Sequence, residues 1–294
     1  MSTSHHVRTV VLKHGPVTIH EVGAGTPLLF LHGAFTDGSI WNAVADRLTP
    51  LGYRCILPTL PLGSHRAALA PGADLTPPAL AALVVELIEA LGLAPATIIS
   101  NDTATAVMQL VLTQHPDVVA SAVLTGGDAY EHFLPPVFAS LKLLPYIPGG
   151  LRALAWVMRR PRLARQPWAF GRLSRAGMTS EQAHQWSDAL LHDAGVRRDT
   201  RALIRGFHRR HTLQAAARFA SVTQPVCVAW GREDAVFPFR LGERMARELG
   251  NAEFRLIERA STYVQLDAPD ELAALIHDAA RRHATARPRD VVPA

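Results

Sequence analysis

An aspartate stands where an apolar strand pattern changes into a helical one. The segment is IISNDTATAVMQL, residues 98–110, and Asp102 lies at its turn. A carboxylate can displace a leaving group from a strained or halogenated carbon directly, which forms an alkyl-enzyme ester. At the start of the helix that begins near Ala104, the anion would also be stabilised by the helix dipole, by about 0.3–1 kcal/mol. Aspartate is a common N-cap residue as well, so a purely structural role is the alternative.

Strand-like and helical patterns alternate on either side of this turn. Strands are predicted over 7–13, 17–22, 27–33, 53–61, 96–100, 120–127, 225–230 and 253–258. Helices are predicted over 39–51, 75–93, 104–115, 241–249 and 270–283. Such alternation predicts an α/β fold with a mostly parallel central sheet of about eight strands, covered by helices on both faces. The first two strands are expected to form a hairpin.

The alternation stops between residues 128 and 219. This segment has helical patterns only, interrupted by prolines, and its part from Leu151 to Phe219 holds fourteen arginines and four acids. A helical insertion before the last two strand–helix units predicts a cap domain over the carboxyl ends of the strands, where open α/β sheets bind ligands. We therefore expect a core of residues 1–127 and 220–294 with a helical cap of residues 128–219.

Four motifs, in this order, resemble those of the α/β-hydrolase superfamily, and the resemblance covers nearly the whole chain. They are FLHGAFTDGSIW (30–41), SNDTA (100–104), WGREDAVFP (230–238) and ERASTYVQLDAPDELAALI (258–276). In that superfamily they correspond to the oxyanion loop, the turn that bears the nucleophile, the loop that bears the acid and the segment of the catalytic histidine. An aspartate at the turn is similar to the branch of haloalkane dehalogenases and epoxide hydrolases.

The resemblance implies roles for five residues. Asp102 would be the nucleophile and Asp234 the acid of the triad. The backbone N–H groups of Ala34 and Thr103 would form the oxyanion hole, whose donors are worth about 2.7–4 kcal/mol each in other enzymes. The fourth motif departs from the family, because Thr262 stands at the usual histidine position. Hydrolysis of an alkyl-enzyme ester needs a base that activates water, and a threonine cannot supply one.

Two other residues are candidates for the missing function. His65 follows the strand 53–61, so its loop is expected to open at the same edge of the sheet as Asp102 and could supply the base. A loop histidine bonded to backbone is the alternative. Asp128 follows the strand 120–127, where related enzymes sometimes carry their acid, and the alternative there is a cap for the next segment.

Aromatic residues near the start of the cap are the expected substrate contacts. Epoxide hydrolases use cap tyrosines to protonate the epoxide oxygen, which makes Tyr130 and Tyr146 candidates. Phe35 and Phe133 would line a mainly apolar pocket that Asp102 faces, and Asp128 would contribute to it. Ordinary packing of the cap is the alternative explanation for these aromatic residues.

Dehalogenation is not expected. The halide-holding side chains of dehalogenases are absent, because Ala34 and Thr103 stand at the two positions concerned. Neither side chain can supply the indole or amide N–H that holds a leaving halide.

Three functions from different classes remain open. The first is an epoxide hydrolase-like enzyme that acts on a small, largely apolar molecule through Asp102 with an incomplete triad. The second is a non-hydrolytic lyase, isomerase or cyclase of a biosynthetic pathway. The third is a ligand-binding protein that has lost catalysis. The presence of both Asp102 and Asp234 favours an enzyme, and Thr262 separates the first function from the other two.

Composition adds expectations about partners and location. The net charge is +5, but 28 of the 30 basic residues are scattered arginines without interleaved aromatics, so no nucleic acid is expected. The sequence shows neither a signal-peptide pattern nor an apolar run long enough to span a membrane, which predicts a cytoplasmic protein. Cys55 and Cys227 lie in apolar strand patterns, without metal-binding spacing. We expect a small-molecule substrate and neither metal nor cofactor, and a homodimer is left open.

Overall fold

Eight strands form a single sheet in the computed structural model, which describes residues 5–286. The order across the sheet is β1-β2-β4-β3-β5-β6-β7-β8. The β1–β2 and β2–β4 pairs are antiparallel, and all the other pairs are parallel. The strands are β1 His5–Leu12, β2 Gly15–Gly23, β3 Thr26–Leu31, β4 Tyr53–Thr59, β5 Ala96–Asp102, β6 Val119–Gly127, β7 Val226–Gly231 and β8 Ala252–Ile257. The predicted fold class and opening hairpin are confirmed.

The central strands carry the structural core. Every residue of β5, β6 and β7 is buried. A parallel strand that is covered on both faces appears in the sequence as a continuous apolar run, which is the pattern that these strands show. Their carboxyl ends therefore meet at one edge of the sheet, and β5 delivers Asp102 to that edge.

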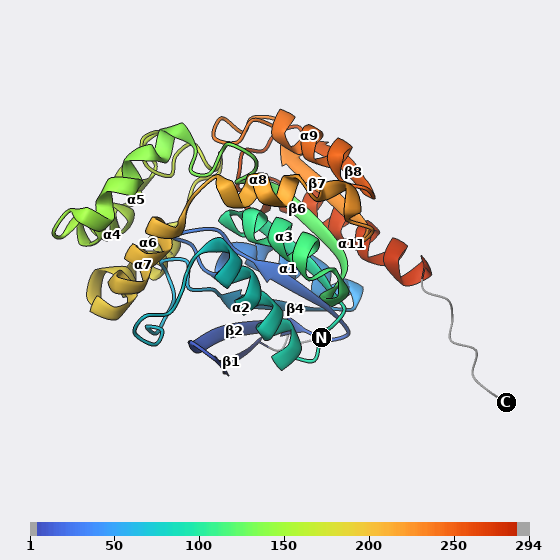
Figure 1. Ribbon diagram of the computed structural model, residues 1–294, viewed down its shortest axis with the longest axis horizontal. Helices are drawn as coiled ribbons and strands as arrows, with labels where there is room; N and C mark the ends of the chain where they lie inside the picture. Colours follow the sequence, from blue (N-terminus) through green and yellow to red (C-terminus); the bar gives the residue numbers. More distant parts are fainter. Residues whose placement is uncertain (1–4, 287–294) are drawn as a thin grey trace.

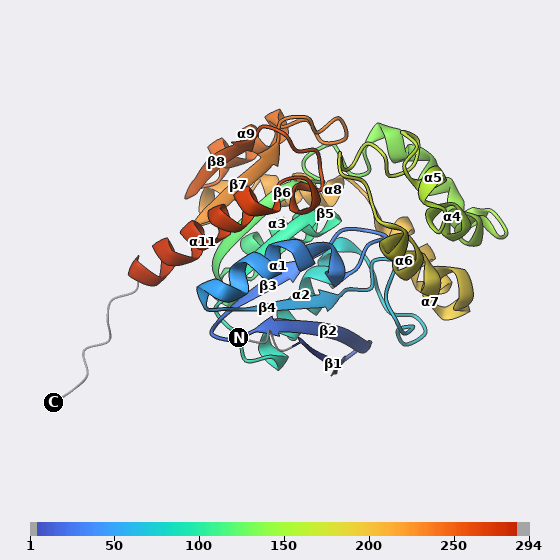
Figure 2. The same ribbon diagram turned by 180° about the vertical axis from the view of Figure 1, so that it is seen from behind.

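Helices cover both faces of this sheet (Figures 1 and 2). On one face, α1 (Asn42–Leu48) contacts α11 (Pro269–Ala286). On the other face, α2 (Pro77–Ala90) contacts α3 (Thr103–Gln114), and α3 also contacts α8 (Arg210–Ala216). Nearly every residue of α3 is buried because the helix is enclosed by the sheet and its two helical neighbours. This enclosure fixes the position of the turn that precedes α3.

The remaining helices of the core agree with the predicted positions, with limits that differ by a few residues. The predicted helix over 39–51 divides into a 3-10 turn at Gly38–Trp41, the helix α1 and a second 3-10 turn at Thr49–Leu51. That last turn stops at Gly52, whose φ of 86° is a left-handed conformation that favours glycine. Near the carboxyl end of the chain, α9 (Arg240–Glu248) packs on β7 and β8, and α10 (Val264–Asp267) precedes α11.

The insertion between β6 and β7 is helical. All residues from 128 to 219 are described, and none belongs to a strand, apart from one isolated bridge between Ala129 and His132. Its elements before α8 are a 3-10 segment Pro136–Tyr146, α4 Gly150–Met158, α5 Pro161–Ala164, α6 Ser180–His192 and α7 Ala194–Gly206. Figure 1 shows α4 to α7 beside the sheet and α8 over α3. The cap boundaries at 128 and 219 stay a prediction, and the packing of α8 places the end of the insertion on the core.

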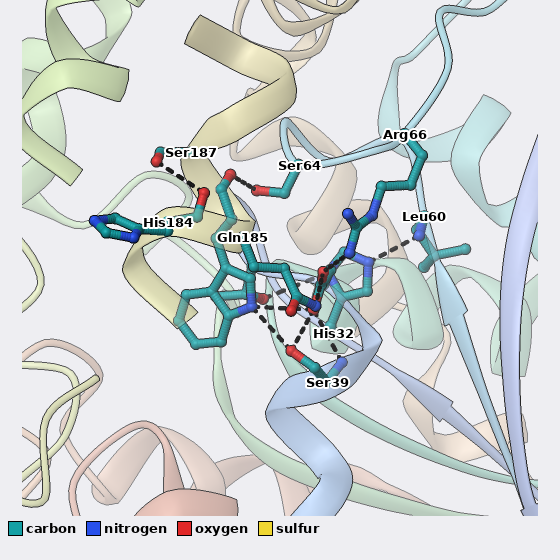
Figure 3. Close-up of polar contacts among 11 residues, drawn as sticks. His32, Ser39, Leu60, Ser64, Arg66, His184, Gln185 and Ser187 are labelled. Carbon is teal, nitrogen blue, oxygen red and sulfur yellow. Dashed lines mark hydrogen bonds and ion pairs between the residues drawn. The ribbon is translucent and has the colours of Figure 1, made fainter. Parts of the chain in front are cut away.

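A buried carboxylate ties α6 to the core. Asp37, in the loop after β3, accepts hydrogen bonds from the Ser39 backbone at 2.9 Å, from Gln185 at 2.8 Å and from the Trp186 indole at 3.0 Å. Arg66 lies 3.1 Å from the same carboxylate, and Figure 3 shows Ser39, Arg66 and Gln185 converging there. Burial opposes ionisation of Asp37, but the hydrogen bonds from Ser39 and Gln185 hold its pKa below the usual range. The loop after β3 and the α6 helix are therefore joined by a charged group.

Candidate active site

Asp102 occupies a strained turn between β5 and α3. Its φ of 56° and ψ of −126° lie outside the regions that non-glycine residues ordinarily adopt. Such strain persists only where the surrounding structure enforces it, and it is concentrated at functional sites. The carboxyl group lies against Gly33, where an added Cβ would be 2.5 Å from the Asp102 Cβ. Because Gly33 has no side chain, the Asp102 carboxyl group can lie directly against the loop after β3.

The two predicted oxyanion donors lie at this carboxylate. The backbone N–H groups of Thr103 and Ala34 both act on Asp102 and favour its ionised form. The first belongs to the start of α3, and the second to the loop after β3. Any charge on the Asp102 side chain is therefore stabilised by two fixed dipoles.

Burial nevertheless dominates the ionisation of Asp102. The residue is 8% exposed. Burial and the nearby charge of Asp234 raise its pKa to about 7, although the N–H groups of Thr103 and Ala34 act in the opposite direction. The side chain therefore exchanges a proton near neutral pH, where an ordinary aspartate is fully ionised.

Thr262 contacts the second predicted acid. Its hydroxyl donates a hydrogen bond of 2.8 Å to Asp234 Oδ1, which also accepts the backbone N–H groups of Val236 and Phe237 at 2.9 and 2.8 Å. The other oxygen, Asp234 Oδ2, is buried and has no hydrogen-bond partner among the described residues. Burial raises the pKa of Asp234 to about 7. A hydroxyl thus occupies the donor position beside this carboxylate.

The Thr262 loop is held to the turn by an amide that the sequence motifs do not identify. Asn101, directly before Asp102, donates hydrogen bonds to the Thr262 carbonyl at 2.8 Å and to Gly126 and Thr125 of β6. In return it accepts a hydrogen bond of 2.8 Å from Gln265. This buried amide holds the Thr262 loop in a fixed position relative to the turn that carries Asp102.

Asp128 is a third buried carboxyl group of the site. It follows β6 and is 2% exposed, and the Thr103 side chain acts to lower its pKa. Its Oδ1 atom has no partner within the described part of the chain. Burial, together with the charge of Asp102, raises the pKa of Asp128 well above its ordinary value. The neutral acid is therefore the stable form of Asp128 when Asp102 is ionised.

Tyr263 belongs to the same site, although sequence reasoning did not select it. It is 2% exposed, and its hydroxyl has no hydrogen-bond partner among the described residues. Burial and the charge of Asp102 raise the pKa of this phenol well above its ordinary value. The available signal was an aromatic residue directly after the histidine position of the fourth motif, and the hydroxyl distinguishes it from a packing residue.

A cavity of about 490 Å³ lies against part of this site, although Asp234 and Thr262 do not line it. Asp102, Thr103, Asp128 and Tyr263 line it, together with Phe35 from the loop after β3. The remaining wall is largely apolar and includes Leu134, Phe138, Leu141, Leu154, Phe170 and Phe207. Among the described residues that line the cavity there is no lysine, arginine or histidine. The site is therefore an apolar chamber with acidic groups at one end.

His65 lies elsewhere, contrary to expectation. It does not line the cavity, and its Nε2 atom is 3.4 Å from Asp199 Oδ2 on α7. The same carboxylate accepts the backbone N–H of Leu69 at 2.7 Å. The loop after β4 therefore runs toward the cap helix α7, and His65 joins this loop to that helix.

His32 is also structural. Its ring accepts the Leu60 N–H at 2.8 Å, and burial lowers its pKa to about 4 (Figure 3).

Two predicted substrate contacts are also outside the cavity wall. Tyr130 adopts a left-handed φ of 52°, and its hydroxyl donates to Glu248 of α9 at 2.9 Å. Phe133 packs on Phe207, with ring centroids 5.2 Å apart, and only Phe207 reaches the cavity. Tyr146 is exposed. Phe133 therefore supports the wall from behind through Phe207, whereas the Tyr130 ring packs on Phe219, which does not line the cavity.

The described residues give limited evidence for other sites. No group of three or more histidine, cysteine, aspartate or glutamate side chains within residues 5–286 has an arrangement that could hold a metal ion. None of the helices that the structure describes is both long enough and apolar enough to cross a membrane. Cys55 and Cys227 are buried, and burial raises the pKa of each thiol to about 12.

Solved structures share this fold. A haloalkane dehalogenase described as a putative ancestor superposes with a TM-score of 0.75 and 20% identity, over 95% of this chain and 100% of that one. The epoxide hydrolase CorEH gives a TM-score of 0.75 with 16% identity, over 96% and 99% of the two chains. An α/β hydrolase fold protein from Burkholderia ambifaria gives 0.77 with 20% identity, over 94% and 100%. At these identities the similarity concerns the fold.

Similarity in sequence extends to named proteins. Human Protein ABHD8 is 26% identical over 259 residues, which are 87% of this chain and 55% of that protein, so the chain spans about half the length of this relative. A Dechloromonas aromatica protein named 2-hydroxy-6-oxononadienedioate/2-hydroxy-6-oxononatrienedioate hydrolase 1 is 24% identical over 292 residues, with 94% and 95% coverage. The family model described as "Alpha/beta hydrolase family" matches residues 28–275. With this match over most of its length, and with the fold and motifs described above, the chain belongs to the alpha/beta hydrolase family.

Proposed function

We propose that this chain is an enzyme that transforms an apolar small molecule by proton transfer through Asp102, without hydrolysis. The reaction class is that of an isomerase, lyase or cyclase. The observation that carries the proposal is the hydrogen bond from the Thr262 hydroxyl to Asp234, because a hydroxyl there provides no base for water. A hydrolase that forms an ester on Asp102 would need such a base to release its product.

The ionisation of Asp102 supports the same conclusion. A general acid or base works best when its pKa lies near the working pH, and the pKa of Asp102 is raised to about 7. A nucleophilic carboxylate gains nothing from such a shift, since only its ionised form attacks. The environment of Asp102 therefore suits a group that gives and takes protons.

The cavity supports an apolar, uncharged substrate. Its wall is largely apolar, and its described lining contains the two carboxyl groups of Asp102 and Asp128 and no basic side chain. The D. aromatica relative is named for a dienedioate, a dicarboxylate. A dicarboxylate would meet Asp102 and Asp128 without a compensating cation, which is unfavourable in a buried site. We therefore propose that this chain acts on a different class of compound from that relative.

Product mass tests this proposal. The protein is incubated with a panel of apolar epoxides, esters, ketones and enones, and the products are analysed by mass spectrometry. Proton-transfer catalysis gives products of unchanged mass, or elimination products, and Asp102→Asn abolishes their formation. Products heavier by one water, formed at multiple turnover by the wild type, would refute the proposal.

The second candidate is an epoxide hydrolase-like enzyme in which Asp102 attacks carbon. The observation in its favour is the pair of N–H groups from Ala34 and Thr103 on the carboxylate, which hold it as a nucleophile would be held. This candidate predicts a stable adduct of one epoxide on Asp102 in intact-protein mass spectrometry. Thr262→His should then convert the stalled adduct into turnover, because it restores a base beside Asp234.

A ligand-binding protein without catalysis is the third candidate, and the site argues against it. A strained backbone at Asp102 costs on the order of 1–3 kcal/mol. Two carboxyl groups whose pKa is raised to about 7 add to that cost at neutral pH. A binding pocket gains nothing from either feature, whereas proton transfer uses both.

A further inference from the structure

Two polar atoms at the acidic end of the cavity lack partners. Asp128 Oδ1 and Tyr263 Oη are buried, and neither has a hydrogen-bond partner among the described residues. An unsatisfied buried polar group costs about 1–3 kcal/mol, so native structures retain such groups mainly where function requires them. Both residues line the cavity beside Asp102. A ligand oxygen that accepts from both groups would satisfy them.

The three groups divide into one base and two donors. Asp102 receives the N–H groups of Thr103 and Ala34, which favour its anion. Asp128 has one oxygen without a partner, and the neighbouring Asp102 anion opposes its ionisation, so it holds the proton of the pair. Burial and the charge of Asp102 raise the pKa of the Tyr263 phenol well above its ordinary value, so the phenol is a donor at neutral pH. An ionised carboxylate beside a neutral carboxylic acid and a phenol is a known arrangement for proton transfer next to a carbonyl group.

Resting on the function proposed above, we propose that the substrate is an apolar ketone or enone. Its carbonyl oxygen accepts hydrogen bonds from Asp128 and Tyr263, and Asp102 moves the proton of the neighbouring carbon. A carbonyl oxygen has two lone pairs and can accept both donors at once. The apolar wall of the cavity encloses the rest of the molecule. This assigns Asp128 and Tyr263 as catalytic residues.

The reaction is balanced within these groups. The Asp102 carboxylate takes a proton from the carbon next to the carbonyl, and the electron pair of that C–H bond moves toward oxygen to form an enolate. Asp128 and Tyr263 donate hydrogen bonds to the oxygen as its charge develops. The Asp102 carboxylic acid then returns the proton, either to the same carbon or, in an enone, to the far end of the conjugated system. In the first case the ketone is regenerated, and in the second the double bond has moved; in both cases Asp102 is regenerated, and neither water nor an oxidant is consumed.

Hydrogen exchange tests this step without knowledge of the natural substrate. Apolar cyclic ketones and β,γ-unsaturated ketones are incubated with the protein in D₂O, and deuterium next to the carbonyl is followed by NMR. The wild type should exchange deuterium into at least one of them, and Asp102→Asn should not. Tyr263→Phe should lower the exchange rate about 10²–10³-fold, the usual loss for one donor to a developing oxyanion.

A matched phenol provides the control. Tyr53 is 6% exposed and bonded to His277 at 2.9 Å, at the start of β4 and thus at the opposite edge of the sheet. Tyr53→Phe removes one buried hydroxyl without reaching the cavity, so exchange should continue at the wild-type rate. The inference is overturned if no ketone of the panel exchanges, or if Tyr263→Phe and Tyr53→Phe exchange equally fast.

Binding of 2-naphthol, a planar mimic of an enolate, gives an independent readout. Fluorescence titration should show binding to the wild type and at least tenfold weaker binding to Tyr263→Phe. The two proposals fail separately. The ketone assignment alone is overturned by a combination of results. The protein would neither exchange deuterium into ketones nor bind 2-naphthol, but it would convert another compound at unchanged mass in a reaction that depends on Asp102. Hydrated products overturn the proton-transfer function itself.

Discussion

Neutralising the Asp102 side chain should stabilise the protein at alkaline pH. The folded-state pKa of Asp102 is raised to about 7, against an ordinary value of 3.8. One pKa unit corresponds to about 1.4 kcal/mol, so ionising this buried group costs about 4 kcal/mol of folding free energy in full. Asp102→Asn removes the charge, and the amide oxygen can still accept the N–H groups of Thr103 and Ala34.

The direction of the pH dependence follows from proton binding. Between pH 4 and 7 the folded Asp102 retains a proton that the unfolded chain has released, so wild-type stability falls as pH rises through this window. The Asn variant lacks this loss. Its stability relative to the wild type should therefore grow by about 2–3 kcal/mol from pH 5 to pH 8. Electrostatic coupling to Asp128 moves the result toward the higher value, because Asp128 ionises more easily once Asp102 is neutral and the variant then loses less stability as pH rises.

Urea denaturation at pH 5 and pH 8 measures this difference. Comparing the two pH values cancels any constant effect of the amide on packing. The control is Asp117→Asn, which changes an exposed carboxylate in the 3-10 turn after α3 and should show no such growth with pH. If the advantage of Asp102→Asn is equal at both pH values, Asp102 is ionised without penalty and the acid–base reasoning is wrong.

Three further outcomes are expected. Gly33→Ala places a Cβ 2.5 Å from the Asp102 Cβ and should reduce activity at least about 10²-fold. Circular dichroism should show that the variant is still folded, and full activity would contradict the close approach of the two residues. Gln185→Leu removes a 2.8 Å donor from Asp37 and should lower the free energy of unfolding by about 1 kcal/mol in urea, whereas Gln114→Leu on the exposed side of α3 should not. No halide should be released from simple haloalkanes, and steady release that Asp102→Ala abolishes would refute this expectation.

The frame of the site could be predicted from the sequence because local patterns encode it. The buried strands β5, β6 and β7 show continuous apolar runs, and the change to helical periodicity marks the turn at Asp102. The carboxyl edge of a parallel sheet then gathers the loops that follow these strands. Asp128 follows β6, and it lies in the cavity with Asp102 for this reason.

The remaining residues depend on distances that no local pattern contains. His65 follows β4 at the predicted edge, but its loop turns toward Asp199 on α7, and the position of a cap helix cannot be read from periodicity. The Asn101 amide bridges two loops that are 161 residues apart in the chain. Tyr263 was visible only as an aromatic position, and its significance depends on a hydroxyl that has no partner in the folded structure.

The threonine at position 262 links the two unusual properties of this site. A histidine beside Asp234 would form an ion pair with it, and the imidazolium would also lower the pKa of the nearby Asp102. A hydroxyl stabilises Asp234 by hydrogen bonding but brings no positive charge, so burial raises the pKa of both carboxyl groups to about 7, and the charge of Asp234 adds to the shift of Asp102. One residue type therefore removes the base that hydrolysis needs and gives Asp102 the proton affinity that acid–base catalysis needs. The incomplete triad is, on this argument, the cause of the proposed chemistry.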